Sequence, residues 1–186
     1  HVGLAIHSLR DPRVANALQR QLALHDHQRF AIHVYSPTPQ PDPAVTQRIA
    51  RDCAGAIEIA HMTDDEAVGR IRLDELDVFV DMAFNSPWCR PEIPERRVAP
   101  VQMRQSTWHR HHPSRPCDYN MSDRFVHPDT LDLEEYGAVV RLPHTCWRPM
   151  AGTCTCCKTT ATPWCWPIPA VITANPDLMN WLLEPL

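Results

Sequence analysis

The stretch Leu76-Asp77-Val78-Phe79-Val80-Asp81 decides the fold of the first half of the chain. Leu76, Val78 and Val80 are apolar residues at every second position and the run stops at the carboxylate of Asp81, which predicts a strand. Earlier strands are predicted at residues 2–6, 30–35 and 56–60, with helices around residues 14–22, 45–53 and 64–71 between them. Regular alternation of strands and helices predicts an α/β fold, a Rossmann-like open parallel sheet with helices on both faces.

The same pattern predicts where a ligand would bind. In open parallel sheets, ligands lie beyond the carboxyl ends of the strands. Three segments are therefore expected at one rim: residues 7–11, residues 36–37 and residues 81–90. Asp81 is a candidate for binding a hydroxyl or acting as a base, although a carboxylate at a strand end is as often a cap.

The rest of the chain is less regular. Residues 81–124 are rich in proline and predict no element except a strand at 98–103, and one more strand is expected at 138–142. Residues 146–169 show neither a helical nor a strand period. Asn175, Pro176 and Asp177 then predict a helix start, with Asn as the cap and Pro in the first turn. We expect a lobe at 1–145, an irregular segment at 146–169, and a terminal helix or the start of a second lobe at 170–186.

Composition narrows the class of protein. The 186 residues carry a net charge of −4, which gives no reason to expect a nucleic-acid partner. No apolar run approaches the length needed to span a membrane, and no signal peptide opens the chain, so we expect a cytoplasmic protein. Lys158 is the one lysine among 18 basic residues, a bias typical of a GC-rich, bacterial genome.

The first cluster of side chains that could bind a ligand or take part in a reaction is Trp108-His109-Arg110-His111-His112. Three imidazoles within four residues can ligate a metal, contact a phosphate or sugar, or simply belong to a solvated loop. We expect no bound metal here. Asp118 and Tyr119, with Asp123, form either a sugar-facing pair or a turn.

The second cluster is Cys154-Thr155-Cys156-Cys157, flanked by Cys146 and Cys165. Structural zinc sites pair their ligands with two to four residues between them, so this spacing is a poor match. The segment is either a locally divergent sequence or a peptide read in the wrong frame. If it is genuine, a metal-binding role for the tail is an alternative interpretation of the chain.

Five stretches of the chain resemble the O-GlcNAc transferase family of SPINDLY-like glycosyltransferases, in the right order over about 145 residues. They are Arg10-Asp11 with Val14-Ala15 and Leu18, His25 to Phe30 with Val34-Tyr35-Ser36, Leu76 to Asp81, Arg90-Pro91-Glu92 with Arg97 to Gln102, and Asp118-Tyr119 with Asp123, Leu142-Pro143 and Trp147. Pro176-Asp177-Leu178 also resembles the first helix of the family's second half. The resemblance is to the amino-terminal half of the catalytic region.

This resemblance implies the first lobe of a two-lobed GT-B enzyme. Such enzymes move N-acetylglucosamine from UDP-GlcNAc to Ser or Thr hydroxyls of protein acceptors, without another cofactor, and the second lobe makes most nucleotide contacts. The isolated chain is then expected to be inactive. On this basis we expect Arg10, Asp11, Asp81, Arg90, Trp108 and Asp118 to bind substrate. We expect His109, His111 and His112, which the family pattern does not contain, to supply the catalytic imidazole.

Three departures from the family pattern favour an alternative, a binding or scaffold module without transfer activity. Pro12 stands where the family has a histidine, and a proline cannot transfer a proton. Phe84-Asn85-Ser86 replaces the family's G-H-T. The family's glycine-rich loop falls on residues 105–113, where Arg110 and the histidines would fill space that glycines leave open.

Overall fold

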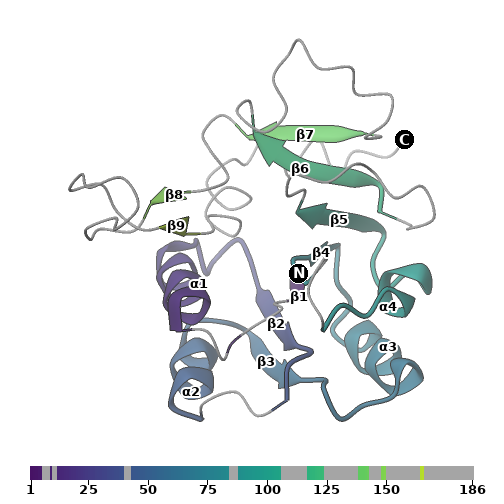
Figure 1. Cartoon of the computed structure of the whole chain (residues 1–186), viewed down its shortest axis with the longest axis horizontal. Helices are drawn as coiled ribbons and strands as arrows, with labels where there is room; N and C mark the ends of the chain where they lie inside the picture. The colour runs from purple at the N-terminus through teal and green to yellow at the C-terminus, as the bar shows by residue number, and fades with distance from the viewer. Residues whose placement is uncertain are drawn as a thin grey trace.

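The computed structural model describes residues 1–5, 9, 12–39, 43–83, 88–105, 117–123 and 138–142, and the backbone of 148–149 and 164–165. Its centre is a seven-stranded sheet in the order β3-β2-β1-β4-β5-β6-β7, in which every pair is parallel (Figure 1). The strands are β1 (Val2–Ala5), β2 (Ile32–Ser36), β3 (Gly55–Glu58), β4 (Val78–Asp81), β5 (Val101–Gln105), β6 (Tyr119–Asp123) and β7 (Val139–Leu142). The predicted open parallel α/β sheet is confirmed.

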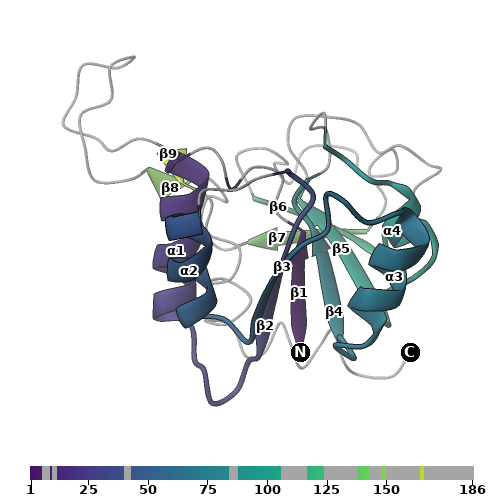
Figure 2. The ribbon, with the colours of Figure 1, turned by 90° about the horizontal axis from the view of Figure 1, so that it is seen from below.

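Helices cover both faces of the sheet, as predicted. Figure 2 shows α1 (Pro12–Leu24) and α2 (Pro43–Arg51) on one face, and α3 (Asp64–Arg72) and α4 (Glu92–Glu95) on the other. Each face has its own apolar core, represented by Leu22, Val34 and Ile49 on the first and by Ile71 and Phe79 on the second. No helix in the described ranges is long and apolar enough to cross a bilayer.

One expectation about the second half of the chain was wrong. Residues 81–124 contain the short helix α4 and the strand β6 in addition to β5. Within 146–169, two short antiparallel strands pair with each other, β8 (Arg148–Pro149) and β9 (Trp164–Cys165). The helix predicted from Asn175 lies outside the described residues.

The start of α3 is fixed by its own sequence. The Thr63 hydroxyl accepts a hydrogen bond from the Glu66 backbone N–H at 3.3 Å, and the Glu66 carboxylate accepts one from the Thr63 N–H at 2.8 Å. These bonds form a capping box, and the hydrogen bonds from Thr63 lower the pKa of Glu66. The loop after β3 therefore passes into α3 at a defined residue, next to the carboxyl edge of the sheet.

At the other end of α3, Asp74 ties the helix to the sheet. The Tyr35 hydroxyl, on β2, donates to Asp74 Oδ2 at 2.6 Å, and Arg70 lies 2.9 Å from the other oxygen. Burial raises the pKa of Asp74, but the hydrogen bonds from Tyr35 and Arg70 outweigh it and hold the pKa below its ordinary value. Burial, with the bond to Asp74, raises the pKa of Tyr35.

We expect Tyr35→Phe to lower the free energy of unfolding by about 1–2 kcal/mol at pH 7, because a buried bond to a carboxylate is lost. A carboxyl with a lowered folded pKa adds stability above its unfolded pKa of about 3.9 and loses it as the pH falls through the folded value. The difference between wild type and variant should therefore shrink at pH 3. Urea unfolding at both pH values measures it, and an equal loss at both would contradict a role through the carboxylate.

Close packing at the centre of the sheet requires a glycine. A Cβ added at Gly3, in β1, would lie 2.3 Å from Leu76 Cδ1 and 3.1 Å from Tyr35 Cε2. A Cβ atom essentially never lies within 3 Å of a non-bonded heavy atom, so the leucine side chain would have to move and the ring would have to shift slightly. Gly69, on the exposed side of α3, has no atom within 4 Å of an added Cβ.

These two glycines make a matched pair for mutation. We expect Gly3→Ala to lower the free energy of unfolding by about 1–3 kcal/mol through overpacking. Gly69→Ala should raise it by about 0.5–1 kcal/mol, because alanine restricts the unfolded chain and favours the helix. Chemical denaturation measures both changes, and a neutral Gly3→Ala would show that the strands are not packed as closely as described.

Candidate functional site

The carboxyl ends of the central strands lie side by side, as the strand pattern predicts. Ala5, the last residue of β1, pairs with Tyr35 of β2 on one side and with Asp81 of β4 on the other. From β1 the strand order runs to β2 and β3 in one direction, whereas β4 to β7 follow in the other. This reversal is the topological switch point, where open α/β sheets form a ligand crevice. Ser36 and Asp81 therefore flank the end of β1, as expected.

Asp81 is buried at this edge and shapes the loop that leaves β4. Its side chain is 6% exposed, and its Oδ1 accepts a hydrogen bond from the Ala83 backbone N–H at 2.9 Å. This is the local turn that an aspartate makes with the residue two positions on. The carboxylate thus directs the chain that follows β4 through a turn.

Arg90 joins three segments of the same edge. Its Nε–H donates to Asp64 Oδ1 at 2.7 Å and its Nη1 donates to the Ile59 carbonyl at 2.7 Å. Its own carbonyl accepts from the Ile93 N–H at 3.1 Å, at the start of α4. The side chain is only 18% exposed, so this ion pair is partly shielded from water. Arg90 therefore holds the starts of α3 and α4 against the segment after β3.

Asp81 and Arg90 line the same small hollow, which we call the rim pocket. Its other lining residues are Ala5, Pro37, Ile59, Phe79, Ala83, Ile93 and Pro94. The free space is about 10 Å³, which is room for about one water molecule. The described residues here therefore build the floor of a crevice rather than a cavity for a sugar. Arg10, Asp11, Trp108, His109, His111 and His112 lie outside the described residues.

Asp118 lies at the opposite edge of the sheet. It immediately precedes β6, and the residue before a parallel strand is at the amino edge, away from the rim pocket. Its carboxylate accepts from Arg97 Nη2 at 2.9 and 3.0 Å and from the Gln102 N–H at 2.7 Å. Arg97 has a positive φ of 47° in this turn. The structure gives Asp118 the turn role that was weighed from the sequence, and does not bring it to Asp81 and Arg90.

Two polar residues of this region were missed from the sequence. The sequence predicts Asp64 only as the first residue of the helix at 64–71, because no sequence signal links it to Arg90, 26 positions later. Gln105 ends β5 and is 2% exposed, and its side-chain amide has no hydrogen-bond partner in the structure as described. A buried polar residue in a strand usually finds a partner, so Gln105 could have been singled out as a polar position at the carboxyl edge.

Metal binding and thiol chemistry find no support in the described ranges. They hold no cluster of three His, Cys, Asp or Glu side chains that could bind a metal ion. Burial raises the pKa of Cys53 to about 11, so this thiol is protonated and unreactive near neutral pH. The cysteine cluster at 154–157 lies outside the described residues.

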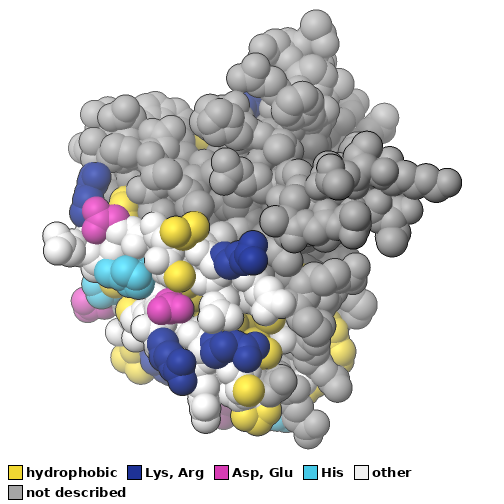
Figure 3. Space-filling model, turned by 90° about the vertical axis from the view of Figure 1, so that its left-hand side faces the viewer, with side chains coloured by type: hydrophobic (Ala, Val, Ile, Leu, Met, Phe, Trp, Pro, Cys, Tyr) yellow, Lys and Arg dark blue, Asp and Glu magenta, His cyan; other side chains and the backbone are white. Residues whose placement is uncertain are grey.

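The face formed by α1 and α2 carries arginines among mixed side chains. Arg20 and Arg51 are exposed and Arg48 is half-buried. On the side of the molecule that Figure 3 shows, the basic side chains of the described residues are separated, with histidine, acidic and apolar side chains between them. They do not form the continuous basic strip that tracks a nucleic-acid backbone.

Comparison with known proteins gives a structural match. No protein-family model and no curated protein sequence matches the chain. Among solved structures, a mutant of the Thermobaculum terrenum O-GlcNAc transferase is similar, with a TM-score of 0.66 and 24% sequence identity. The match covers 83% of this chain and 30% of that one, so the chain spans less than a third of its structural neighbour. The fold is therefore that of a lobe found in a GT-B glycosyltransferase.

The contribution of the Arg90–Asp64 ion pair to stability can be compared with that of a second arginine–aspartate pair nearby. Arg96 also reaches the first turn of α3, at Asp65, but these side chains are 41% and 87% exposed. We expect a double-mutant cycle on Arg90→Ala and Asp64→Ala to give a coupling of about 1–2 kcal/mol. The Arg96→Ala and Asp65→Ala cycle should give about 0–1 kcal/mol, because solvent screens an exposed pair. Equal couplings, measured by urea unfolding, would show that Arg90 does not fasten the rim.

Proposed function

We propose that this chain is the amino-terminal lobe of a glycosyltransferase of the O-GlcNAc transferase type. The whole enzyme would move a sugar from UDP-GlcNAc, or a similar nucleotide sugar, to Ser or Thr hydroxyls of a protein acceptor. The observation that carries the proposal is the structural match over 83% of the chain, which agrees with the sequence resemblance in five ordered stretches.

In this proposal the carboxyl rim faces the cleft between two lobes. The switch point at β1 and β4 supports it, because ligands of such sheets bind beyond that point. Asp81 and Arg90 would define the shape of the acceptor side, since their side chains fasten the loops after β4 and before α4. Arg10 or Arg90 would offset diphosphate charge, and a histidine of the loop at 109–112 would orient the acceptor hydroxyl.

A second candidate function is a binding or scaffold module that has lost transfer activity. One structural observation favours it, because Asp81 and Arg90 are engaged with partners inside the lobe. The sequence adds Pro12 in place of the family's histidine and the loss of G-H-T at Phe84-Asn85-Ser86. The two candidates differ in one measurable property, which is turnover of the nucleotide sugar.

The test uses the full-length protein with radiolabelled UDP-GlcNAc and a mixture of acceptor proteins. Transfer of label to protein, or release of UDP by hydrolysis, is the expected result. The chain by itself is expected to show neither. A complete and folded protein that turns over no nucleotide sugar would contradict the transferase and support the scaffold module.

A second prediction concerns the histidine loop. His111→Ala should lower the transfer rate by roughly a hundredfold if its imidazole assists proton transfer in the reaction. The control is His27→Ala, because His27 is an exposed histidine in the turn before β2, at the amino edge of the sheet. The control should retain full activity. An unchanged rate for His111→Ala, with stability equal to wild type, would remove the loop from the chemistry.

A further inference from the structure

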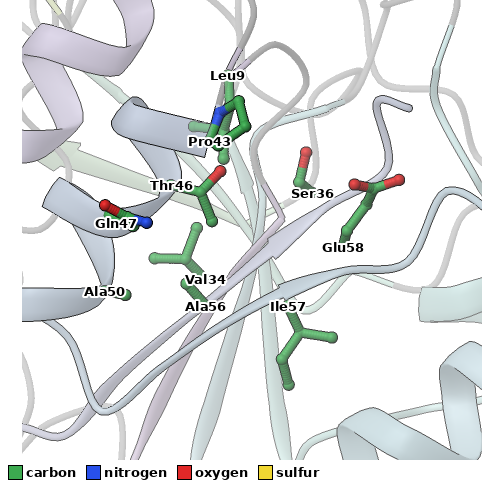
Figure 4. Close-up of a pocket in the computed structure, with 10 residues that line it drawn as sticks. All are labelled: Leu9, Val34, Ser36, Pro43, Thr46, Gln47, Ala50, Ala56, Ile57 and Glu58. Carbon is green, nitrogen blue, oxygen red and sulfur yellow. The ribbon is translucent and has the colours of Figure 1, made fainter. Parts of the chain in front are cut away.

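A second cavity lies beside the rim pocket, between α2 and the edge strand β3, and reaches the carboxyl end of β2 (Figure 4). It measures about 380 Å³, within the range of about 300–1,000 Å³ that is usual for small-molecule sites. The lining residues are Leu9, Val34, Ser36, Pro43, Thr46, Gln47, Ala50, Ala56, Ile57 and Glu58. Ser36, and Leu9 from the segment at 7–11, also belong to the carboxyl rim, whereas the other eight lining residues are not part of the site proposed for the transferase.

The cavity exists because α2 overhangs the edge of the sheet. The helix packs on the sheet through Val45 and Ile49, which are buried. Thr46 and Ala50 are one residue further around the helix, and they face β3, whose four residues are all only half-buried. Alanines at 50 and 56 are too small to close the gap, so a hollow remains between the helix and the strand.

The strand register sorts the lining into two layers. Val34 of β2 pairs with Ala56 of β3, and two residues later Ser36 pairs with Glu58. All four are on the face toward α2, since side chains two apart in a strand share a face. Helix α2 adds one residue to each layer. Thr46 lies by the polar pair of Ser36 and Glu58, and Ala50 lies by the apolar pair of Val34 and Ala56. Figure 4 shows the oxygens of Ser36, Thr46 and Glu58 on one side, and Val34, Ala50 and Ala56 on the other.

The charge of the lining residues indicates which ligand charge the cavity favours. Glu58 is the one charged residue among the described lining residues, and no Lys or Arg is among them. His61 lies 3.0 Å from Glu58 Oε1 at the outer edge. The Glu58 carboxylate accepts hydrogen bonds from hydroxyl groups and repels a phosphate or a carboxylate, and the hydroxyls of Ser36 and Thr46 can accept or donate hydrogen bonds. The cavity therefore favours an uncharged ligand with hydroxyls at one end and an apolar face at the other.

We propose that this cavity binds a nucleoside. A nucleoside has the same two zones, because its flat base presents apolar faces and its ribose presents vicinal hydroxyls. The base would lie between Val34, Ala50 and Ala56, with the amide of Gln47 available to its polar edge. The ribose hydroxyls would donate to Glu58, which is how carboxylates at strand ends of α/β sheets bind ribose. A monosaccharide, polar around its whole edge, would leave hydroxyls against the apolar layer.

The test is titration of the ¹⁵N-labelled full chain with adenosine and with uridine, followed by NMR. Saturable shifts confined to residues of α2, β2 and β3 are expected from at least one nucleoside. Free ribose and the free base should each bind more weakly than the intact nucleoside. These shifts do not depend on transfer activity, so this proposal and the transferase can fail separately.

Two variants and one control sharpen the test. Ala50→Leu fills the cavity and should abolish the shifts, whereas Ala44→Leu makes the same change on α2 outside the lining and should leave binding intact. Glu58→Gln keeps the size of the side chain but removes its charge, and should weaken binding about tenfold. Thermal unfolding and the dispersion of the spectrum show whether each variant is folded.

Three results would overturn the proposal. The first is the absence of saturable shifts with either nucleoside up to its solubility limit. The second is unchanged binding by a folded Ala50→Leu variant, which would locate the ligand elsewhere. The third is tighter binding of adenosine 5′-monophosphate than of adenosine, because a lining with Glu58 and no cation cannot favour an added phosphate.

Discussion

The parallel pairing of β1 with both β2 and β4 is the constraint on which the rest of the structure depends. Because β1 lies between these two strands, the chain must cross one face of the sheet to reach β2 and the other face to continue from β4. The helices then cover both faces, and the switch point falls at the end of β1. Gly3 leaves room for this packing, since an added Cβ would lie 2.3 Å from Leu76 Cδ1 and 3.1 Å from Tyr35 Cε2 unless these side chains moved. A single backbone position thus supports the packing beneath the rim.

Much of this fold could be predicted from the sequence, and the failures have physical reasons. Strands β1, β2 and β4 are buried and mostly apolar, so their pattern is clear. Strand β6 was missed because it buries Asn120 and Ser122, whose polarity resembles that of a loop. Helix α4 was missed because its four residues, with Pro94 among them, are too few to show a helical period. Both β6 and α4 are therefore stabilised by tertiary contacts, and the local sequence does not predict them.

The candidate site was predictable in position but not in detail. A strand that ends at Asp81 must bring this residue to the carboxyl edge, and the structure confirms it. The ion pair of Arg90 with Asp64 joins segments 26 residues apart, and no local pattern predicts such a contact. The position of Asp118 was not predicted because strand β6 was not predicted. With β6 recognised, Asp118 would have been expected at the amino edge of the sheet. The nucleoside cavity also depends on register, since only the pairing of β2 with β3 aligns Ser36 with Glu58.

The central claim is that this sheet is one lobe of a two-lobed transferase, with its rim turned toward a nucleotide-binding partner lobe. The most direct test is to sequence the coding DNA from the codon for Leu142 to well beyond that for Leu186. We predict an open frame that continues into a second α/β lobe, either directly or after a shift of frame within residues 146–169. A confirmed cysteine-rich segment followed by a stop codon near Leu186 would contradict the claim, because no lobe would then be present to hold the nucleotide.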